Sequence, residues 1–283
     1  MSVDRPKLIE LRELTKAGMS DCLTALAEAS GDLDRAAALL KERGLAAVED
    51  RSGREAAEGR VFLRAGGTRA AMAELGCETD FAARSEPFAE AGERIVELAY
   101  DRGADEAAPE AAAIVAELGR VVREKVELRR LACIACSEGE RLSVYLHGEG
   151  EVGAVVRWRA EGAEGLDDER AAAFFHDAAL HVAAFAPRFV DEASIGAERR
   201  AEMAEVFRRE LEAEPASASK PPALREAILA GRLRKRLAAA TLLTQGFVRD
   251  DKIPFAAALR RLEAESGHAF EITGFERFAA RGE

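Results

Sequence analysis

Two runs of alternating apolar and polar residues near the middle of the chain limit its fold more than any other feature. In residues 142–147, Leu, Val and Leu alternate with Ser, Tyr and His, and in residues 152–158 apolar side chains again fill every second position. Gly148-Glu149-Gly150 lies between the two runs. Because successive side chains of a strand point to opposite faces, this pattern predicts an antiparallel hairpin with one buried face.

A second hairpin is predicted upstream of this region. Residues 61–65 form a strand candidate that leads into Gly66-Gly67, a strong hairpin turn signal. The return segment, residues 69–75, suits helix or strand by propensity, and the turn favours strand. A last strand is predicted over residues 270–278. The chain therefore contains the strands that antiparallel sheets require.

The remaining sequence has the spacing of amphipathic helices. Ala, Leu, Glu and Arg dominate and aromatic residues make up only 6%, a composition that favours helix. Helical spacing of apolar residues occurs in residues 86–100, 108–122, 166–185, 196–214 and 255–265, and another helix is expected from residue 223 onward. The Pro- and Ser-rich residues 215–222 are expected to join two of these helices into an antiparallel pair. We therefore expect an α+β fold.

Three details of this helical region are also predicted. The helix over residues 166–185 is expected to bury Phe185 and to end before Pro187. Phe189-Val190 is expected to start a short edge strand. Val206 is assigned to a narrow apolar stripe along residues 196–214.

Residues 7–44 contain three short amphipathic runs that are separated by glycines. The runs end near Gly18, Gly31 and Gly44, and the third begins at Asp32, whose carboxylate suits an N-cap. Gly44 suits the position just beyond the end of a helix. Three short helices form a compact bundle, and such a unit is usually a docking module because it has no cavity for chemistry.

Composition argues against several functional classes. The chain has 283 residues and a net charge of −11, whereas general nucleic-acid binding needs clustered Lys and Arg. No run of about 18 apolar residues is present, so no membrane span is expected. The N-terminal residues lack the apolar core of a signal peptide. We expect a cytoplasmic protein without direct nucleic-acid or membrane contact.

The sequence assembles no active site or metal site. It lacks the phosphate-loop pattern G-x-x-x-x-G-K-[ST] and the nucleophile motif G-x-S-x-G. Its four histidines are not at metal-binding spacing. Cys133 and Cys136 form a single C-x-x-C in a strand-like run, where residues three apart face opposite sides. We interpret these cysteines as buried thiols and expect no enzyme activity, no cofactor and no metal.

The order of residue types in residues 74–84 is hard to explain by packing alone. A small polar run from Cys77 to Asp80 leads directly into Phe81, and the helix of residues 86–100 follows. Asp80 therefore lies at or near a helix start, where a carboxylate can accept free backbone N–H groups. Two interpretations stay open. Either Thr79 or Asp80 is a simple helix cap and Phe81 a core residue, or Phe81 points outward.

The run Cys77-Glu78-Thr79-Asp80-Phe81-x-Ala83-Arg84 resembles the central signature of the elongation factor Ts family, the nucleotide exchange factors of elongation factor Tu. Further segments are similar to family motifs in the same order along the chain. They are the runs from Leu11 to Leu26, Tyr145 to Gly153, His181 to Pro187, Gly231 to Phe247, and Gly274 to Phe278.

The resemblance implies a guanine-nucleotide exchange factor that binds the GDP-bound form of elongation factor Tu. It implies that Asp80 and Phe81 enter the partner near its magnesium and nucleotide site, with Thr79 and Ala82 completing the segment. It also implies secondary contacts with the partner. The residues at those contacts are Met19, Cys22, His147, Val152, Gly153 and His181.

The patterns and the resemblance together imply the domain organisation. Residues 1–46 form a three-helix, ubiquitin-associated-like bundle, and residues 47–60 a linker. Residues 61–137 form a core N-subdomain that carries the Thr-Asp-Phe segment. Residues 138–195 and 233–283 form a core C-subdomain, and residues 196–232 an inserted, coiled-coil-like helical hairpin. Antiparallel sheets with packed helices make up the core.

Other interpretations stay open. The three-helix bundle alone suits a protein-binding module, with the rest of the chain as a scaffold. The chain also departs from the family pattern, which leaves open a relative that binds elongation factor Tu without promoting exchange. The departures are Gly76 for the usual Asn, Ala82 for Val, Ser20 for a second Met, Gly246 for Pro, and Glu151 for a basic residue. A homodimer through the helical hairpin is a further open point.

Overall fold

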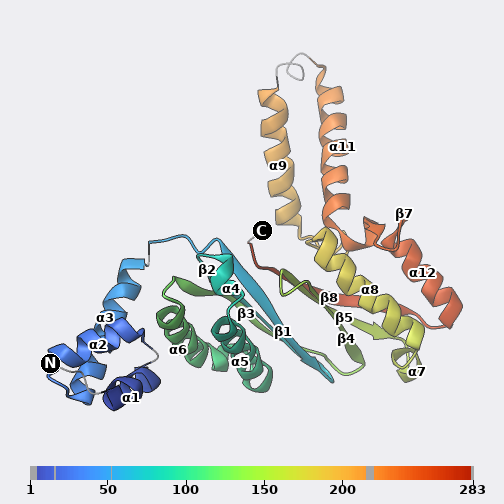
Figure 1. Ribbon diagram of the computed structural model, residues 1–283. Coiled ribbons are helices and arrows are strands. Elements are labelled where there is room, and N and C mark those ends of the chain that lie inside the picture. The colour runs from blue at the N-terminus through green and yellow to red at the C-terminus, as the bar shows by residue number, and fades with distance from the viewer. Residues whose placement is uncertain (1–4, 16, 52, 215–219, 282–283) are drawn as a thin grey trace. The chain divides into compact units, whose positions relative to one another are not determined.

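The first three helices pack their apolar residues into a core of their own. A computed structural model describes residues 5–15, 17–51, 53–214 and 220–281. It begins with α1 (Arg5–Thr15), α2 (Met19–Glu28) and α3 (Leu33–Arg51) (Figure 1). The buried residues of this core are Leu11, Cys22, Ala25, Leu26, Ala29 and Ala36. The prediction of three N-terminal helices is confirmed.

The third helix is longer than the sequence predicted. Its start is confirmed, because Asp32 Oδ1 accepts a hydrogen bond from the backbone N–H of Arg35 at 3.0 Å. Its predicted end at Gly44 is wrong, because α3 continues to Arg51. A glycine inside a helix costs only about 1 kcal/mol relative to alanine. The following residues, Leu-Ala-Ala-Val-Glu-Asp-Arg, include enough good helix formers to carry the helix past it.

Backbone contacts divide the chain into two units. One unit comprises Met1–Ile134, Gly148–Val152 and Phe278–Glu283, and the other comprises Ala135–His147 and Gly153–Arg277. We call them unit 1 and unit 2. The subdomain boundaries expected from the sequence stay a prediction.

Unit 1 contains a three-stranded sheet in the order β1-β2-β3. Strands β1 (Glu58–Gly66) and β2 (Arg69–Cys77) pair antiparallel, with Gly66 opposite Arg69, and β3 is Val126–Ala135. The predicted hairpin is confirmed, but its two-residue turn is Gly67-Thr68, one position later than expected. Gly67 has φ 57°, a conformation that favours glycine.

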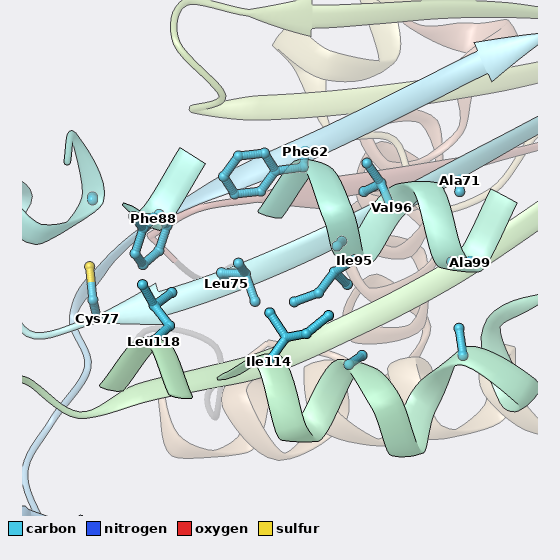
Figure 2. Close-up of a cluster of buried hydrophobic side chains, with 14 of the residues drawn as sticks. Phe62, Ala71, Leu75, Cys77, Phe88, Ile95, Val96, Ala99, Ile114 and Leu118 are labelled. Atoms are coloured by element: carbon cyan, nitrogen blue, oxygen red, sulfur yellow. The ribbon is translucent and has the colours of Figure 1, made fainter. Parts of the chain in front are cut away.

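Helices α5 (Glu86–Arg102) and α6 (Ala104–Val122) enclose the core of unit 1. Figure 2 shows Leu75, Phe88, Ile95, Ile114 and Leu118 converging between these helices and the sheet. Gly103, with φ 92°, ends α5 as the sequence predicted. Helix α6 begins four residues earlier than expected, and Pro109 lies inside it.

Unit 2 contains a three-stranded sheet in the order β4-β5-β8. The strands are β4 (Glu140–His147), β5 (Val152–Ala160) and β8 (Phe270–Ala279), so the predicted central hairpin and last strand are confirmed. Trp158 stacks on Phe175 with ring centroids 4.2 Å apart. Phe175 belongs to α8 (Glu169–Phe185), and α12 (Phe255–Ser266) contacts α8.

Two details around α8 differ from the prediction. The expected helix over residues 166–185 is divided into α7 (Ala163–Leu166) and α8, because Asp168 caps α8 by accepting a hydrogen bond from the N–H of Arg170. Phe185, expected to be buried, is 48% exposed. It is the last residue of α8, and Ala186 follows it with φ 46°.

A pair of long helices, α9 (Ala197–Ala213) and α11 (Pro222–Ala240), forms the predicted helical hairpin (Figure 1). Leu211, Leu229 and Leu237 are buried, whereas Val206 is 53% exposed, so the apolar stripe of α9 is only partly covered. Phe189 makes a single bridge to Thr241 and starts no strand. The expected connection over residues 215–222 lies largely outside the described residues.

Short elements follow α11, namely η1 (Leu242–Thr244), β6 (Gly246–Phe247) and β7 (Asp250–Pro254). Cys22 and Cys77 are buried, but Cys133 and Cys136 are only partly buried, which corrects the expectation that both are buried thiols. Among the described helices, none has both the length and the apolar character that a membrane crossing requires.

Candidate functional site

A four-residue helix, α4 (Asp80–Ala83), follows β2 directly. Thr79 is its N-cap, with extended backbone angles of φ −127° and ψ 155°, and its Oγ1 accepts a hydrogen bond from the N–H of Ala82 at 3.2 Å. Asp80 is the first helical residue. The predicted helix start is therefore confirmed, and Thr79 is the residue whose side chain caps it.

Phe81 points away from the core. Its side chain is 83% exposed, whereas the next two residues, Ala82 and Ala83, are 6% and 4% exposed and belong to the core of unit 1. Successive residues of a helix are about 100° apart around the axis. Because two consecutive alanines face inward, Phe81 faces solvent. Of the two interpretations left open by the sequence, the structure supports the outward one.

The start of α4 is held by residues that come from the connection between α6 and β3. Glu124 accepts two hydrogen bonds from Thr79, one from its N–H at 2.9 Å and one from Oγ1 at 2.6 Å. In the opposite direction, the N–H of Lys125 donates to Glu78 Oε1 at 2.6 Å. These contacts tie residues 78–79 to residues 124–125. We refer to residues 79–82 as the wedge segment and to the Thr79–Glu124 contact as the clamp.

Cys77 is buried next to the clamp. Its Sγ donates to the carbonyl oxygen of Thr79 at 3.2 Å. Burial, with a smaller contribution from the nearby Glu124 carboxylate, raises the pKa of Cys77 to about 12. The thiol is therefore neutral at physiological pH, and it supports the wedge segment without acting as a nucleophile.

The loop between β4 and β5, Gly148–Val152, is the second part of the site, and it belongs to unit 1. The N–H of Val61 donates to the Gly150 carbonyl at 2.7 Å, and Arg60 Nε donates to the Glu149 carbonyl at 2.6 Å. The Arg60 guanidinium also reaches the Ala83 carbonyl at 3.5 Å. Arg60 therefore contacts both this loop and α4.

A hollow of about 680 Å³ lies between α4, this loop and the C-terminal residues of unit 1. Asp80 and Val152, both predicted site residues, line it. The structure thus brings together two sequence-predicted segments that are about 70 residues apart in the chain. The lining residues are Glu58, Gly59, Arg60, Asp80, Ala83, Arg84, Gly148, Glu149, Gly150, Glu151, Val152, Ala279, Ala280 and Arg281.

The other predicted site residues differ in exposure. Met19 is 42% exposed on α2, and its neighbour on the same helix, Cys22, is buried. His147 is exposed at the end of β4, and its Nδ1 is hydrogen-bonded to Tyr145 Oη at 3.1 Å. Gly153, in β5, is buried. Met19 and His147 therefore present side chains to solvent, whereas Cys22 and Gly153 do not.

His181 is fully buried in unit 2, so its side chain does not face solvent. Its Nε2 donates to Gln245 Oε1 at 2.9 Å, and its Nδ1 has no hydrogen-bond partner within the described part of the chain. The ring centroids of Phe185 and Phe255 lie 4.7 and 5.2 Å from the ring centroid of His181. Burial lowers the pKa of His181, and the hydrogen bond that it donates to Gln245 opposes this only in part. A direct contact with a partner is therefore not available to this side chain in this structure.

Two residues of the site were not predicted from the sequence. Glu124 lies in a charged run, Arg-Glu-Lys, that reads as solvated surface, and Arg60 lies in a strand of mixed polarity. Their partners are 45 and 89 residues away in the chain. No local pattern in the sequence marks either residue.

The arrangement suits recognition of another protein. In the described residues, no group of three or more His, Cys, Asp or Glu side chains is placed to hold a metal ion. The site instead presents an exposed aromatic ring and a carboxylate from a fixed helix start, beside a hollow with both signs of charge. Fold and site together are those of an α+β protein that presents an exposed aromatic ring for contact with another protein.

Comparison with known proteins gives the family. The family model described as elongation factor TS matches residues 78–282. An elongation factor Ts from Treponema denticola is 33% identical over 273 residues, which cover 96% of each chain. Relatives with the same name from Treponema pallidum (strain Nichols) and Borreliella burgdorferi are 36% and 32% identical, over 93% and 98% of each chain. The chain belongs to the elongation factor Ts family.

Proposed function

We propose that this protein is a guanine-nucleotide exchange factor for elongation factor Tu. It binds the GDP-bound form, promotes GDP release and thereby allows GTP to bind. The observation that carries the proposal is Phe81, which stays 83% exposed beside two buried alanines. Family membership supports the choice of partner.

In this proposal the wedge segment acts near the magnesium and nucleotide site of elongation factor Tu. Mg²⁺ offsets the charge of the nucleotide phosphates, so a ring that displaces the surrounding helices weakens GDP binding. No covalent bond is made or broken, and the protein is not an enzyme in the usual sense. The coupling is reciprocal: bound GDP weakens the binding of the exchange factor to elongation factor Tu by the same factor by which the exchange factor weakens the binding of GDP.

The secondary residues take two roles in this proposal. Met19, His147 and Val152 contact the partner directly, because each keeps some exposed side chain. Cys22, Gly153 and His181 act through packing, because they are buried. Ala82 is also buried, and in this proposal it anchors the residue next to Phe81 in the core of unit 1.

We further propose that the protein acts in the cytoplasm without direct nucleic-acid contact, in keeping with its net charge of −11. We also propose that two copies associate through the helical hairpin of α9 and α11, where Val206 is 53% exposed. Sedimentation velocity of the full chain tests this association.

GDP release from purified elongation factor Tu, measured by stopped flow with a fluorescent GDP analogue, tests the main proposal. A buried aromatic ring contributes roughly 1.5–3 kcal/mol, so Phe81→Ala should slow stimulated release by about 10- to 100-fold. Leu224→Ala is the matched control, because Leu224 is an exposed apolar residue outside the site, and it should keep full activity. Unchanged release with Phe81→Ala would rule out the wedge.

The same titration separates the other interpretations. A relative that only binds elongation factor Tu would form the complex but leave GDP release at its unstimulated rate. A binding module built on the three N-terminal helices, which have their own core, would retain partner binding in residues 1–50 alone. Stimulated release by the full chain, lost on Phe81→Ala, is expected from the exchange factor only.

A further inference from the structure

We propose that Glu124 is a positioning residue for the wedge segment. This inference rests on the proposed exchange function, and it assigns to Glu124 the task of fixing the direction in which Phe81 leaves the surface. Glu124 touches neither nucleotide nor partner in this proposal. It acts through Thr79.

The clamp uses both hydrogen-bond donors of Thr79, its backbone N–H and its side-chain hydroxyl. The two carboxylate oxygens of Glu124 accept separately, Oε2 from the Thr79 N–H at 2.9 Å and Oε1 from the Thr79 hydroxyl at 2.6 Å. The hydroxyl can donate its one proton to Glu124 and still accept from the Ala82 N–H at 3.2 Å. The carboxylate therefore fixes both the backbone and the side-chain rotamer of the residue that caps α4.

The clamp is paired with a contact in the opposite direction. Glu78 Oε1 accepts from the backbone N–H of Lys125 at 2.6 Å, so each of the two chain segments lends a carboxylate to the backbone of the other. Such charge-assisted hydrogen bonds are short and stronger than those between neutral groups. Two of them in opposite directions prevent residues 78–79 from sliding along residues 124–125.

The chain around Glu124 is closely packed. Arg123, with φ 60°, turns the chain at the end of α6, and Gly119 lies so close that a Cβ added to it would be 3.2 Å from the Glu124 carbonyl. On the other side, Cys77 and Leu118 are buried in one core (Figure 2). The clamp therefore joins the wedge segment to a part of the protein that is already fixed by packing.

Without the carboxylate, Thr79 can still cap Ala82, but its N–H and its hydroxyl lose their acceptor. The Cys77 contact to the Thr79 carbonyl and the neighbouring Glu78–Lys125 hydrogen bond remain. A four-residue helix is too short to keep its direction unaided. The ring of Phe81 would then sample several directions, and ordering it on contact with the partner would cost part of the binding free energy. The expected loss lies in exchange activity, with the overall fold retained.

The test compares Glu124→Ala and Glu124→Gln with the unchanged protein in GDP release from elongation factor Tu. Glu124→Ala should lower the apparent second-order rate constant of stimulated release by about tenfold. Glu124→Gln keeps the shape and one acceptor oxygen, so it should recover part of that loss. In a Thr79→Val background, the Glu124→Ala change should have a smaller further effect, because the hydroxyl bond is already gone and only the bond from the Thr79 N–H remains to be lost.

A local readout separates positioning from general destabilisation. Amide hydrogen exchange of Ala82 and Ala83, whose N–H groups bond to Thr79, should be about tenfold faster in Glu124→Ala, while Ile95 and Ile114 in the core keep their protection. Glu110→Gln is the matched control. It removes a carboxylate of α6 that pairs with Arg94 and Arg102, and it should change neither readout.

Failure of this inference and failure of the proposed function give different results. If the unchanged protein does not stimulate GDP release, the proposed function fails. The rate of amide hydrogen exchange at Ala82, compared between the unchanged protein and Glu124→Ala, still decides whether Glu124 fixes the start of α4. If the unchanged protein is active and Glu124→Ala keeps full activity, or keeps the protection of Ala82, the positioning role is wrong. A loss of core protection in both Glu124 variants would equally contradict it.

Discussion

At the scale of single residues, the side chain of Phe81 contributes little to the stability of its own fold. A ring that is 83% exposed forgoes most of the roughly 1.5–3 kcal/mol that burial would contribute. Ala82 and Ala83, its two successors, supply the contacts to the core instead. Removing the ring should therefore leave folding stability almost unchanged, which makes a loss of exchange activity in Phe81→Ala interpretable.

His181 shows the opposite case, a polar ring enclosed by aromatic side chains. Burial lowers its pKa below the ordinary value of 6.5, so the folded protein keeps it neutral at a pH where the unfolded chain would protonate it. In that range unfolding takes up a proton. The free energy of unfolding therefore falls as the pH drops below about 6.5, until the lower pKa of the folded state is reached.

We predict that the unchanged protein loses stability between pH 7.5 and pH 5.5 and that His181→Gln loses less over the same interval. Urea unfolding at the two pH values, followed by circular dichroism, measures both. His176→Gln is the control, because His176 is an exposed residue on the same helix, and it should keep the full pH dependence. An equal pH dependence in the His181 and His176 variants would contradict the assignment.

The sequence could predict some of these residues and not others. The helix start at Asp80 follows from local pattern, but the direction of Phe81 depends on which neighbours reach the core. The burial of His181 had a signal in the sequence, since it lies three residues after Ala178 on the inward face of α8. Glu124 had none, because its role comes from a contact with a residue 45 positions away.

At the scale of elements, the loop Gly148–Val152 is held against β1 by backbone contacts that leave no room for a side chain. Gly150 has φ 102°, and a Cβ added to it would lie 2.5 Å from the Val61 carbonyl oxygen. The N–H of Val61 donates to the Gly150 carbonyl at 2.7 Å. Glycine at this position therefore serves both the backbone conformation and the close approach of the two elements.

We predict that Gly150→Ala destabilises the protein by about 1–3 kcal/mol, since it combines a strained φ with a backbone clash, and that it also lowers stimulated GDP release. Gly139→Ala is the control. Gly139 has a similar φ of 80° with open space around its Cβ position, so that variant bears the conformational cost alone. Equal destabilisation in the two variants, by chemical unfolding, would show that the close approach is unimportant.

Element types were more predictable than their ends. Both β-hairpins and the helical hairpin follow from alternation, turn glycines and helical spacing, which are local signals. Helix α3 passes Gly44 because one glycine is a weak stop signal. The break between α7 and α8 at Asp168 had a signal in the sequence, an N-cap residue inside a helical pattern, which the apolar spacing on either side obscured.

At the scale of the whole molecule, the site is assembled from stretches that are far apart in the chain. The wedge segment, the loop Gly148–Val152 and the terminal residues Ala279 to Arg281 all belong to unit 1, although most of residues 135–277 belong to unit 2. Local patterns identify each stretch singly. Their meeting depends on the path of the chain, and neither the local patterns nor the family resemblance predicted it.

Self-association through the helical hairpin is also a property of the whole molecule. The base of the hairpin carries a groove of about 810 Å³ in which Met203, Val206 and Phe207 lie beside charged residues of both signs. A surface with both charges can be self-complementary, as a two-fold interface requires. The net charge of −11 opposes the approach of two copies, and salt screens that repulsion.

We therefore predict a dimer, at twice the 30.5 kDa of one chain, whose population in sedimentation velocity rises with protein concentration and with added salt. Val206→Glu should return the protein to the monomer, because it places a charge in the apolar part of the groove. Leu14→Glu is the matched control, since Leu14 is an exposed apolar residue of α1, and it should dimerise as the unchanged protein does. If the protein stays monomeric at about 100 μM in high salt, the dimer does not exist, because an interface of standard size would be occupied under those conditions. The exposed apolar stripe of α9 would then be available to other partners.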